Sequence, residues 1–238
     1  MINIIWVLIW MGFATIIHEI GHAVVALCFR VKVLDVGWGL GPVVGQRTSY
    51  TGQKWTLRLW PVGAYCALDR ASVEQKPLWV QSAIAGAGIV ANLITAWILT
   101  MAMMRTYVPS LSWWHLPKAG LQLAEALLGM AGRALSHHPG IASGRTLSAS
   151  PLVMVHNVAQ APLIHGTTAL ALGFLINVVL ALTNAIPFPA LDGGRMGFLL
   201  LTKLRGRPYA HEDRWHQWGF RIIMGGFVLW MIHGVWRV

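Results

Sequence analysis

The chain has 238 residues, of which 56% are hydrophobic and only 11% are charged, and its mean hydropathy is +0.58. Soluble domains carry about 25% charged residues, so this composition argues against an ordinary soluble enzyme and excludes an intrinsically disordered chain. Eighteen Lys and Arg against eight Asp and Glu give a net charge of +10, which fits nucleic-acid binding only if the basic residues gather on one soluble face.

Four segments are long and apolar enough to form transmembrane helices, each of which needs about 20 largely apolar residues. They cover about residues 4–29, 79–104, 168–186 and 220–236. The first segment has no basic residues ahead of it and no small-residue cleavage site after it, so we expect it to be retained rather than removed as a signal peptide. The sequence predicts an all-α polytopic membrane protein with about four transmembrane helices, folded as a single domain over residues 1–238.

The first two predicted spans are separated by a stretch of different character, about residues 31–70. Repeated glycines, a turn at residues 50–52 and alternating apolar and polar residues from Trp55 to Leu59 are typical of strands and a hairpin. Unpaired backbone cannot face lipid. We therefore expect a membrane-associated β-hairpin or small sheet that lies at the membrane interface or packs inside the protein.

The distribution of basic residues predicts the orientation in the membrane. Twelve Lys and Arg lie in the connections that follow the first and third spans, and only four lie in the longer loop of about residues 105–165. The positive-inside rule puts the richer side in the cytoplasm, with both termini and the 105–165 loop outside it. Within that loop, Leu121–Leu135 is predicted to be an interfacial amphipathic helix. The positive charge is thus a topology signal, and no nucleic-acid partner is expected.

The first predicted span contains the pattern H-E-x-x-H, as His18-Glu19-Ile20-Gly21-His22. Residues four apart share one face of a helix, so both imidazoles can bind one ion, and zinc suits such ligands. The glutamate points to the adjoining side, where it can take a proton from a water molecule at the ion. Ionisable groups inside a membrane are costly unless they are paired or liganded. We therefore predict one Zn²⁺ bound by His18 and His22, with Glu19 as the catalytic base; a purely structural role is the alternative.

A catalytic zinc site needs a third protein ligand, and Asp192 is the best candidate. The third span crosses the membrane in the same direction as the first, so the segment after it reaches the depth of the two histidines. Pro187 and Pro189 prevent a regular helix before Asp192, and two glycines after it allow the chain to bend. A turn or a helix N-cap is the alternative role for Asp192. The remaining histidines, His216 among them, are predicted to lie in loops or on the surface.

The H-E-x-x-H pattern and the segment Asn184-x-x-Pro187-x-Pro189-x-Leu191-Asp192-Gly193-Gly194-Arg195 together resemble the site-two protease family of intramembrane zinc metalloproteases. Further resemblance lies in the β element at residues 37–42, 57–65 and 68–70, at Ala85-Gly86 followed by Asn92, and at residues 148–151. The match covers most of the chain and is closest to the bacterial branch that processes anti-sigma factors. It implies that His18, His22 and Asp192 ligate zinc, that Glu19 is the catalytic base, and that the protein lies in a bacterial inner membrane with its active site towards the cytoplasm.

The chain also departs from that branch. Relatives often carry one or two PDZ modules between the second and third spans, and about 60 residues of mixed composition cannot hold one, so no PDZ-mediated partner is expected. Ala-Gly-Ala at residues 85–87 and Ser150-Pro151 also differ from the family pattern, but neither touches the predicted metal site.

The predicted function is hydrolysis of a peptide bond in or near a locally unwound transmembrane helix of a membrane-protein substrate, in regulated intramembrane proteolysis. The backbone groups freed by unwinding must be paired, and an edge strand of residues 31–68 can pair them by β-addition. Asn184 is a candidate substrate clamp, with a satisfied interhelical hydrogen bond as the alternative. The other candidate function is a non-hydrolytic zinc-binding membrane protein, either a transporter or a chaperone of membrane helices. The presence of Glu19 and the single broken segment at residues 187–189 favour the protease.

Overall fold

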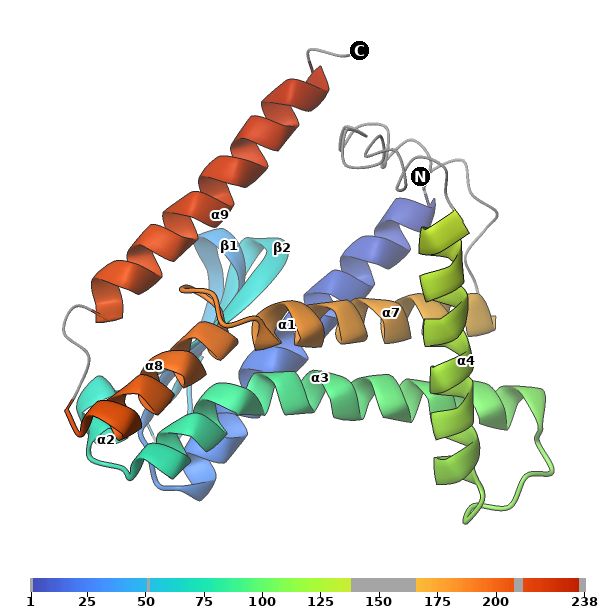
Figure 1. Cartoon of the computed structure of the whole chain (residues 1–238), viewed down its shortest axis with the longest axis horizontal. Coiled ribbons are helices and arrows are strands. Elements are labelled where there is room, and N and C mark those ends of the chain that lie inside the picture. The colour runs from blue at the N-terminus through green and yellow to red at the C-terminus, as the bar shows by residue number, and fades with distance from the viewer. Residues whose placement is uncertain (1, 51, 138–165, 208–211, 236–238) are drawn as a thin grey trace. The chain divides into compact units, whose positions relative to one another are not determined.

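The computed structural model describes residues 2–50, 52–137, 166–207 and 212–235 (Figure 1). The chain divides into two compact units. One unit consists of Leu8–Thr95 and Leu175–Phe220, and the other of Met1–Val7, Ala96–Phe174 and Arg221–Val238. All the predicted site residues belong to the first unit.

Helix α1, Ile2–Cys28, covers the first predicted span and ends in a turn that redirects the chain into the sheet. Arg30 has a positive φ of 56°, the N–H of Arg30 donates to Leu27 O at 2.9 Å, and the N–H of Val31 donates to Ala26 O at 2.8 Å. This pair of bonds is the Schellman arrangement that satisfies the last carbonyls of a helix. The chain thereby leaves α1 directly into the first strand.

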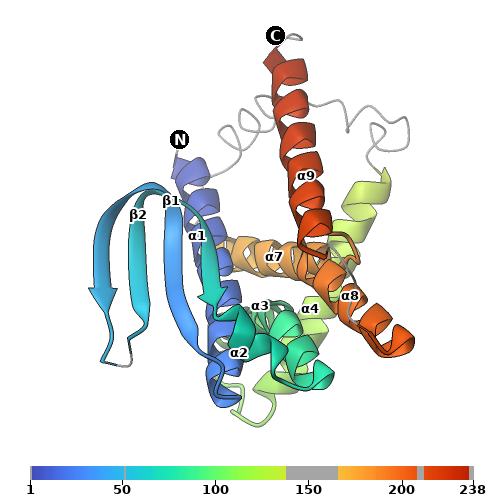
Figure 2. The same ribbon diagram turned by 90° about the vertical axis from the view of Figure 1, so that its left-hand side faces the viewer.

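Two long strands, β1 at Val33–Thr48 and β2 at Lys54–Leu68, form a small sheet beside α1 (Figure 2). Val36 pairs with Cys66 on one side and with Trp55 on the other, so residues 33–38 form an inner run of the sheet. Both strands bend, and Gly39 has a φ of +96° at the bend in β1. The predicted β element between the first two spans is therefore present as a sheet.

A short helix, α2 at Arg70–Glu74, leads into α3, Leu78–Tyr107, and together they complete the core of the first unit. Asp69 caps α2 by accepting a hydrogen bond from the backbone N–H of Ser72 at 3.2 Å. The buried core side chains come from α1, the turn after it, β1, α2 and α3: Ala23, Ala26, Val31, Val33, Val36, Val73, Val80 and Ile84. This core fixes the C-terminal half of α1 against the sheet and the beginning of α3.

Small residues let α1 and α3 approach each other closely. A Cβ atom placed on Gly21 would lie 2.7 Å from both Ala87 O and Ala91 Cβ, so no larger residue fits there without displacing α3. Close packing through small residues is the usual way in which membrane helices associate. Consequently, α3 contacts the histidines of α1 directly, through the backbone of Ile84 and the side chain of Asn92.

Helix α7, Gly166–Ala185, is followed by a tight loop and by α8, Asp192–Arg205, which ends at Gly206 with a φ of +68°. Helix α9 follows at Glu212–Val235. Residues 192–205 were predicted to be part of the connection after the third span, whereas they form helix α8 in the structure.

In the other unit, α4 at Leu116–His137 contains the predicted amphipathic helix. Residues 138–165 of the predicted loop lie outside the described residues.

Three helices are long and apolar enough to cross a membrane: Ile5–Cys28, Leu78–Tyr107 and Gly166–Ala185. They match the first three predicted spans. The fourth predicted span, residues 220–236, falls in α9, which is not among the three candidates found in the described parts of the chain. The chain is thus mostly helical with a small sheet, and a count of four spans stays a prediction.

Candidate metal centre

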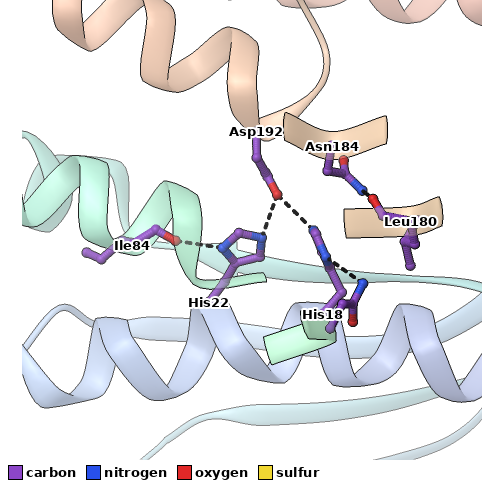
Figure 3. A network of polar contacts seen from close by, with 7 residues as sticks. His18, His22, Ile84, Leu180, Asn184 and Asp192 are labelled. Carbon is purple, nitrogen blue, oxygen red and sulfur yellow. Dashed lines mark hydrogen bonds and ion pairs between the residues drawn. The ribbon is translucent and has the colours of Figure 1, made fainter. Parts of the chain in front are cut away.

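The structure brings His18, His22 and Asp192 together. The two histidines lie one turn apart on α1 and are 5% and 8% exposed. Asp192 Oδ2 lies 2.8 Å from His18 Nε2 and 3.3 Å from His22 Nε2 (Figure 3). One ligand atom from each of the three residues lies within 4.8 Å of the others. The residues that sequence patterns predicted as ligands are therefore close enough to share one ion.

Asp192 is the first residue of α8, and Leu191 occupies the N-cap position, so Asp192 is not the cap. A Cβ atom on Gly193 would collide with the carbonyl oxygens of Ala185 and Ile186, and one on Gly194 with that of Phe188. Neither glycine has a positive φ. The two glycines are needed because α8 begins in close contact with the end of α7, not because the chain bends sharply at them as expected.

The ring of His22 is oriented by a hydrogen bond on its far side. His22 Nδ1 lies 2.7 Å from Ile84 O (Figure 3). A carbonyl oxygen only accepts, so Nδ1 carries a proton, and in the neutral ring the lone pair is on Nε2, which faces Asp192. Histidine ligands of metals are typically held by such a bond.

The carboxylate of Asp192 faces both imidazoles of α1. Its Oδ2 is buried, lies 2.8 Å and 3.3 Å from the two imidazole nitrogens, and makes no contact with hydrogen-bond geometry. A buried anionic oxygen in this situation calls for a cation.

The space beside the two imidazoles is kept open by a glycine. A Cβ atom on Gly88 of α3 would lie 2.5 Å from His18 Nε2 and 2.6 Å from His22 Nε2. Two ligands of a tetrahedral zinc lie about 3.4 Å apart, given zinc–ligand bonds of about 2.0–2.2 Å. The observed 2.8 Å and 3.3 Å are near that separation. The donor set, its spacing and the open space therefore fit zinc.

A cavity of about 630 Å³ adjoins this cluster and is lined by His22, Glu19 and Asp192, together with Cys66 and Leu68 of β2. Glu19 is half-buried, and its carboxylate lies against the backbone of Cys66. The glutamate thus faces the cavity from the same helix that carries both histidines.

Charged residues of α2 and α9 also line this cavity. Arg70 Nε lies 2.6 Å from Glu74 Oε1, and the same guanidinium pairs with Asp213. This ion cluster joins α2 to the beginning of α9.

Asn184 is not brought into the cluster. Its Nδ2 donates to Leu180 O at 3.0 Å within α7, and Asn184 is not among the residues that line the cavity (Figure 3). The bond is intrahelical rather than the interhelical bond considered as the alternative to a substrate clamp.

Two residues near the site were not predicted from sequence. His216 of α9 lines the cavity, and its Nδ1 accepts a hydrogen bond from the backbone N–H of Ala190 at 2.9 Å. Asn92 of α3 is fully buried, and its Nδ2 lies 3.3 Å from His18 Nδ1. The sequence signals for Asn92 were its place in the family resemblance after Ala85-Gly86 and the pair Gly88 and Asn92, which repeats on α3 the four-residue spacing of the histidines on α1.

Comparison with known proteins agrees with the geometry. The family model "Peptidase family M50" matches residues 6–228. A protein of Treponema pallidum (strain Nichols) named "Putative zinc metalloprotease" is 32% identical over 123 residues, 44% of this chain and 27% of that protein. Proteins of the same name from Vibrio cholerae serotype O1 and Thermotoga maritima are 29% and 30% identical, over 42% of this chain in each case and 25% and 22% of their own lengths.

The chain thus matches only about a quarter of the length of these curated relatives. The family match, by contrast, covers nearly the whole chain and includes every predicted site residue. The chain belongs to peptidase family M50, the site-two protease family.

Proposed function

We propose that this chain is a zinc-dependent intramembrane endopeptidase that cleaves a membrane-protein substrate in or near a locally unwound transmembrane helix, in regulated intramembrane proteolysis. The observation that carries the proposal is the convergence of two imidazole nitrogens and one carboxylate oxygen beside a cavity that Glu19 also faces. Membership of a peptidase family and the printed names of the relatives support hydrolysis with zinc.

In this proposal His18, His22 and Asp192 hold one zinc ion. Zinc, when bound, supplies a Lewis acid that polarises the scissile carbonyl and lowers the pKa of water. Glu19 takes a proton from the attacking water and later delivers it to the leaving amine. Its position on the cavity side of α1 supports this role, because a base must reach the water without displacing a ligand.

The substrate backbone must find new partners once its helix unwinds, and β2 offers an edge for this purpose. In the described register, residues 64–68 pair with residues 33–38 on one side only. Cys66 and Leu68 of this run line the cavity. We propose that an unwound substrate segment adds to this edge as a strand, beside Glu19.

Asn184 is a second, separate clamp for the substrate backbone in this proposal. The Asn184→Ala substitution should then raise KM more than it lowers kcat.

The proposed location is a bacterial inner membrane, with the substrate and the bilayer as partners, both termini outside the cytoplasm and the active site towards the cytoplasm. The excess of basic residues after the first and third spans supports this orientation. A membrane-impermeant thiol reagent should then label a cysteine introduced at Gly206 from the cytoplasmic side of membrane vesicles.

The mechanism is tested by Glu19→Gln in the purified full chain. The variant should keep about one zinc, because no ligand is removed, and should lose cleavage of a single-span substrate at least a hundredfold, because general-base catalysis contributes about 10²–10⁴-fold. Asp192→Ala is the matched variant and should lower the zinc content.

Continued cleavage by the Glu19→Gln variant would contradict the role of Glu19, and unchanged zinc in Asp192→Ala would remove that residue from the ligand set. A wild-type protein that binds zinc but cleaves no unwound membrane helix would support the non-hydrolytic alternative.

A further inference from the structure

We infer that Asn92 is a positioning residue of the metal centre: its side-chain carbonyl oxygen accepts a hydrogen bond from His18 Nδ1–H and so directs the lone pair of His18 Nε2 to the ion. This inference rests on the proposed zinc site and adds a residue to it.

Asn92 makes its polar contact in the middle of the packed helices. It is 0% exposed, its Nδ2 lies 3.3 Å from His18 Nδ1, and its Oδ1 is buried without a hydrogen-bond partner. On the opposite side of the same ring, His18 Nε2 lies 2.8 Å from Asp192 Oδ2. The amide and the carboxylate therefore contact the two nitrogens of one imidazole.

The direction of the amide decides what His18 can bind. If the amide N–H donated to Nδ1, a neutral ring would carry its proton on Nε2, and Nε2 would have no lone pair for a metal. The carbonyl oxygen of Asn92 would also stay unpaired. The nitrogen and oxygen of an amide have nearly the same shape, and their assignment follows from hydrogen bonding. A half-turn of the amide pairs the oxygen with Nδ1–H and frees Nε2.

The neighbouring histidine supports this direction. His22 Nδ1 is held by Ile84 O at 2.7 Å, which requires a proton on Nδ1 and, in the neutral ring, leaves the lone pair on Nε2. Ile84, Gly88 and Asn92 follow one another at four-residue intervals on α3, so they share one face. That face offers an acceptor to His22, an open space beside both imidazoles and, with the amide turned, an acceptor to His18.

Two substitutions of similar size separate this role from simple packing. Asn92→Asp keeps an acceptor but cannot donate, whereas Asn92→Leu keeps the volume and removes both. We expect Asn92→Leu to weaken zinc binding about 10- to 100-fold, the usual effect of removing a partner behind a metal ligand. Asn92→Asp should stay within a few-fold of the wild type. The measurement is chelator competition on the purified full chain.

Cobalt substitution gives a second readout that does not depend on cleavage. The visible absorption of bound Co²⁺ reports its ligands and their geometry. At saturating Co²⁺, the spectrum of Asn92→Asp should match the wild type, and that of Asn92→Leu should differ. Asn177→Leu is the matched control, because Asn177 is another fully buried asparagine in a span, and it should leave affinity and spectrum unchanged.

The possible results separate this inference from the proposed function. Full zinc binding by His18→Ala would show that the proposed zinc site is wrong. Loss of zinc in His18→Ala, together with wild-type affinity in Asn92→Leu, would overturn the role of Asn92 alone. If Asn92→Leu fails to fold, Asn92→Asp decides: weakened zinc binding in that variant would mean that the amide donates, and the inference would be wrong.

Discussion

A single missing side chain keeps the metal position open. A methyl group on Gly88 would lie 2.5–2.6 Å from both imidazole nitrogens that face Asp192. Overpacking of this kind costs about 1–3 kcal/mol. Gly88→Ala should therefore weaken zinc binding about tenfold to a hundredfold by displacing the rings, without removing a ligand. Metal content measured by atomic absorption after dialysis checks this expectation.

The same helix provides a control for that substitution. A Cβ atom on Gly86 would meet only Met196, with its Sδ at 3.6 Å, which is an ordinary contact. Gly86→Ala should keep wild-type zinc. Equal zinc contents in the Gly86→Ala and Gly88→Ala variants would contradict the crowding argument.

Cys66 is placed next to the site but is not suited to compete for the metal. Burial, then the charges of Glu19 and Asp35, raise the pKa of its thiol to about 12. Metals bind the thiolate, and at pH 8 the thiolate fraction of such a group is about 10⁻⁴. In a Cys28→Ser background, alkylation of Cys66 by iodoacetamide should be slow. Its rate should rise about tenfold per pH unit from pH 7 to 10. A rate that levels off near pH 9, as for an ordinary thiol, would be inconsistent with the raised pKa.

At the scale of elements, the loop between α7 and α8 carries Asp192, and α9 holds that loop. Ala190 has a positive φ of 84°, which costs a residue other than glycine about 1–2 kcal/mol. Its N–H donates to His216 Nδ1, and Gly219 of α9 allows Pro189 to approach closely. His216→Ala should therefore loosen the loop and weaken zinc binding by about tenfold, as measured by chelator competition.

Ala190→Gly is the companion variant, since glycine adopts positive φ readily. It should bind zinc as tightly as the wild type. Wild-type affinity in His216→Ala would mean that α9 does not hold the ligand loop.

The sequence predicted the three candidate membrane-spanning helices to within a few residues, because apolar length determines them, whereas the fourth predicted span is not among the candidates in the described residues. Residues 79–104 were expected and Leu78–Tyr107 is helical, and residues 168–186 were expected against Gly166–Ala185. The meeting of Asp192 with both histidines was also predictable, from four-residue spacing and membrane depth. The contacts of Asn92 and His216 were not predictable, because neither residue belongs to a ligand-spacing motif and only packing brings each to its partner.

At the scale of the whole molecule, the proposed ligands belong to two separated parts of one compact unit, Leu8–Thr95 and Leu175–Phe220. An ion bound by both parts stabilises the folded chain without binding the unfolded one. At a free zinc concentration of about 100 times Kd this stabilisation is about 2.7 kcal/mol. Adding zinc to chelator-treated protein should therefore raise the midpoint of thermal unfolding. Asp192→Ala should abolish the zinc-dependent part of the shift, and a shift that survives in that variant would point to a different metal site.

The separation of the ligands along the chain also has a consequence for biosynthesis. His18 and His22 leave the ribosome about 170 residues before Asp192, and at about 5–20 residues per second the delay is roughly ten to thirty seconds. During that interval the nascent chain can offer an ion only two of the three proposed ligands. Ile84 and Asn92, which contact the histidines, emerge much earlier than Asp192. If Asp192 is the third ligand, as proposed, the complete metal site forms only after residue 192 has been synthesised, and metal loading is a late step of assembly.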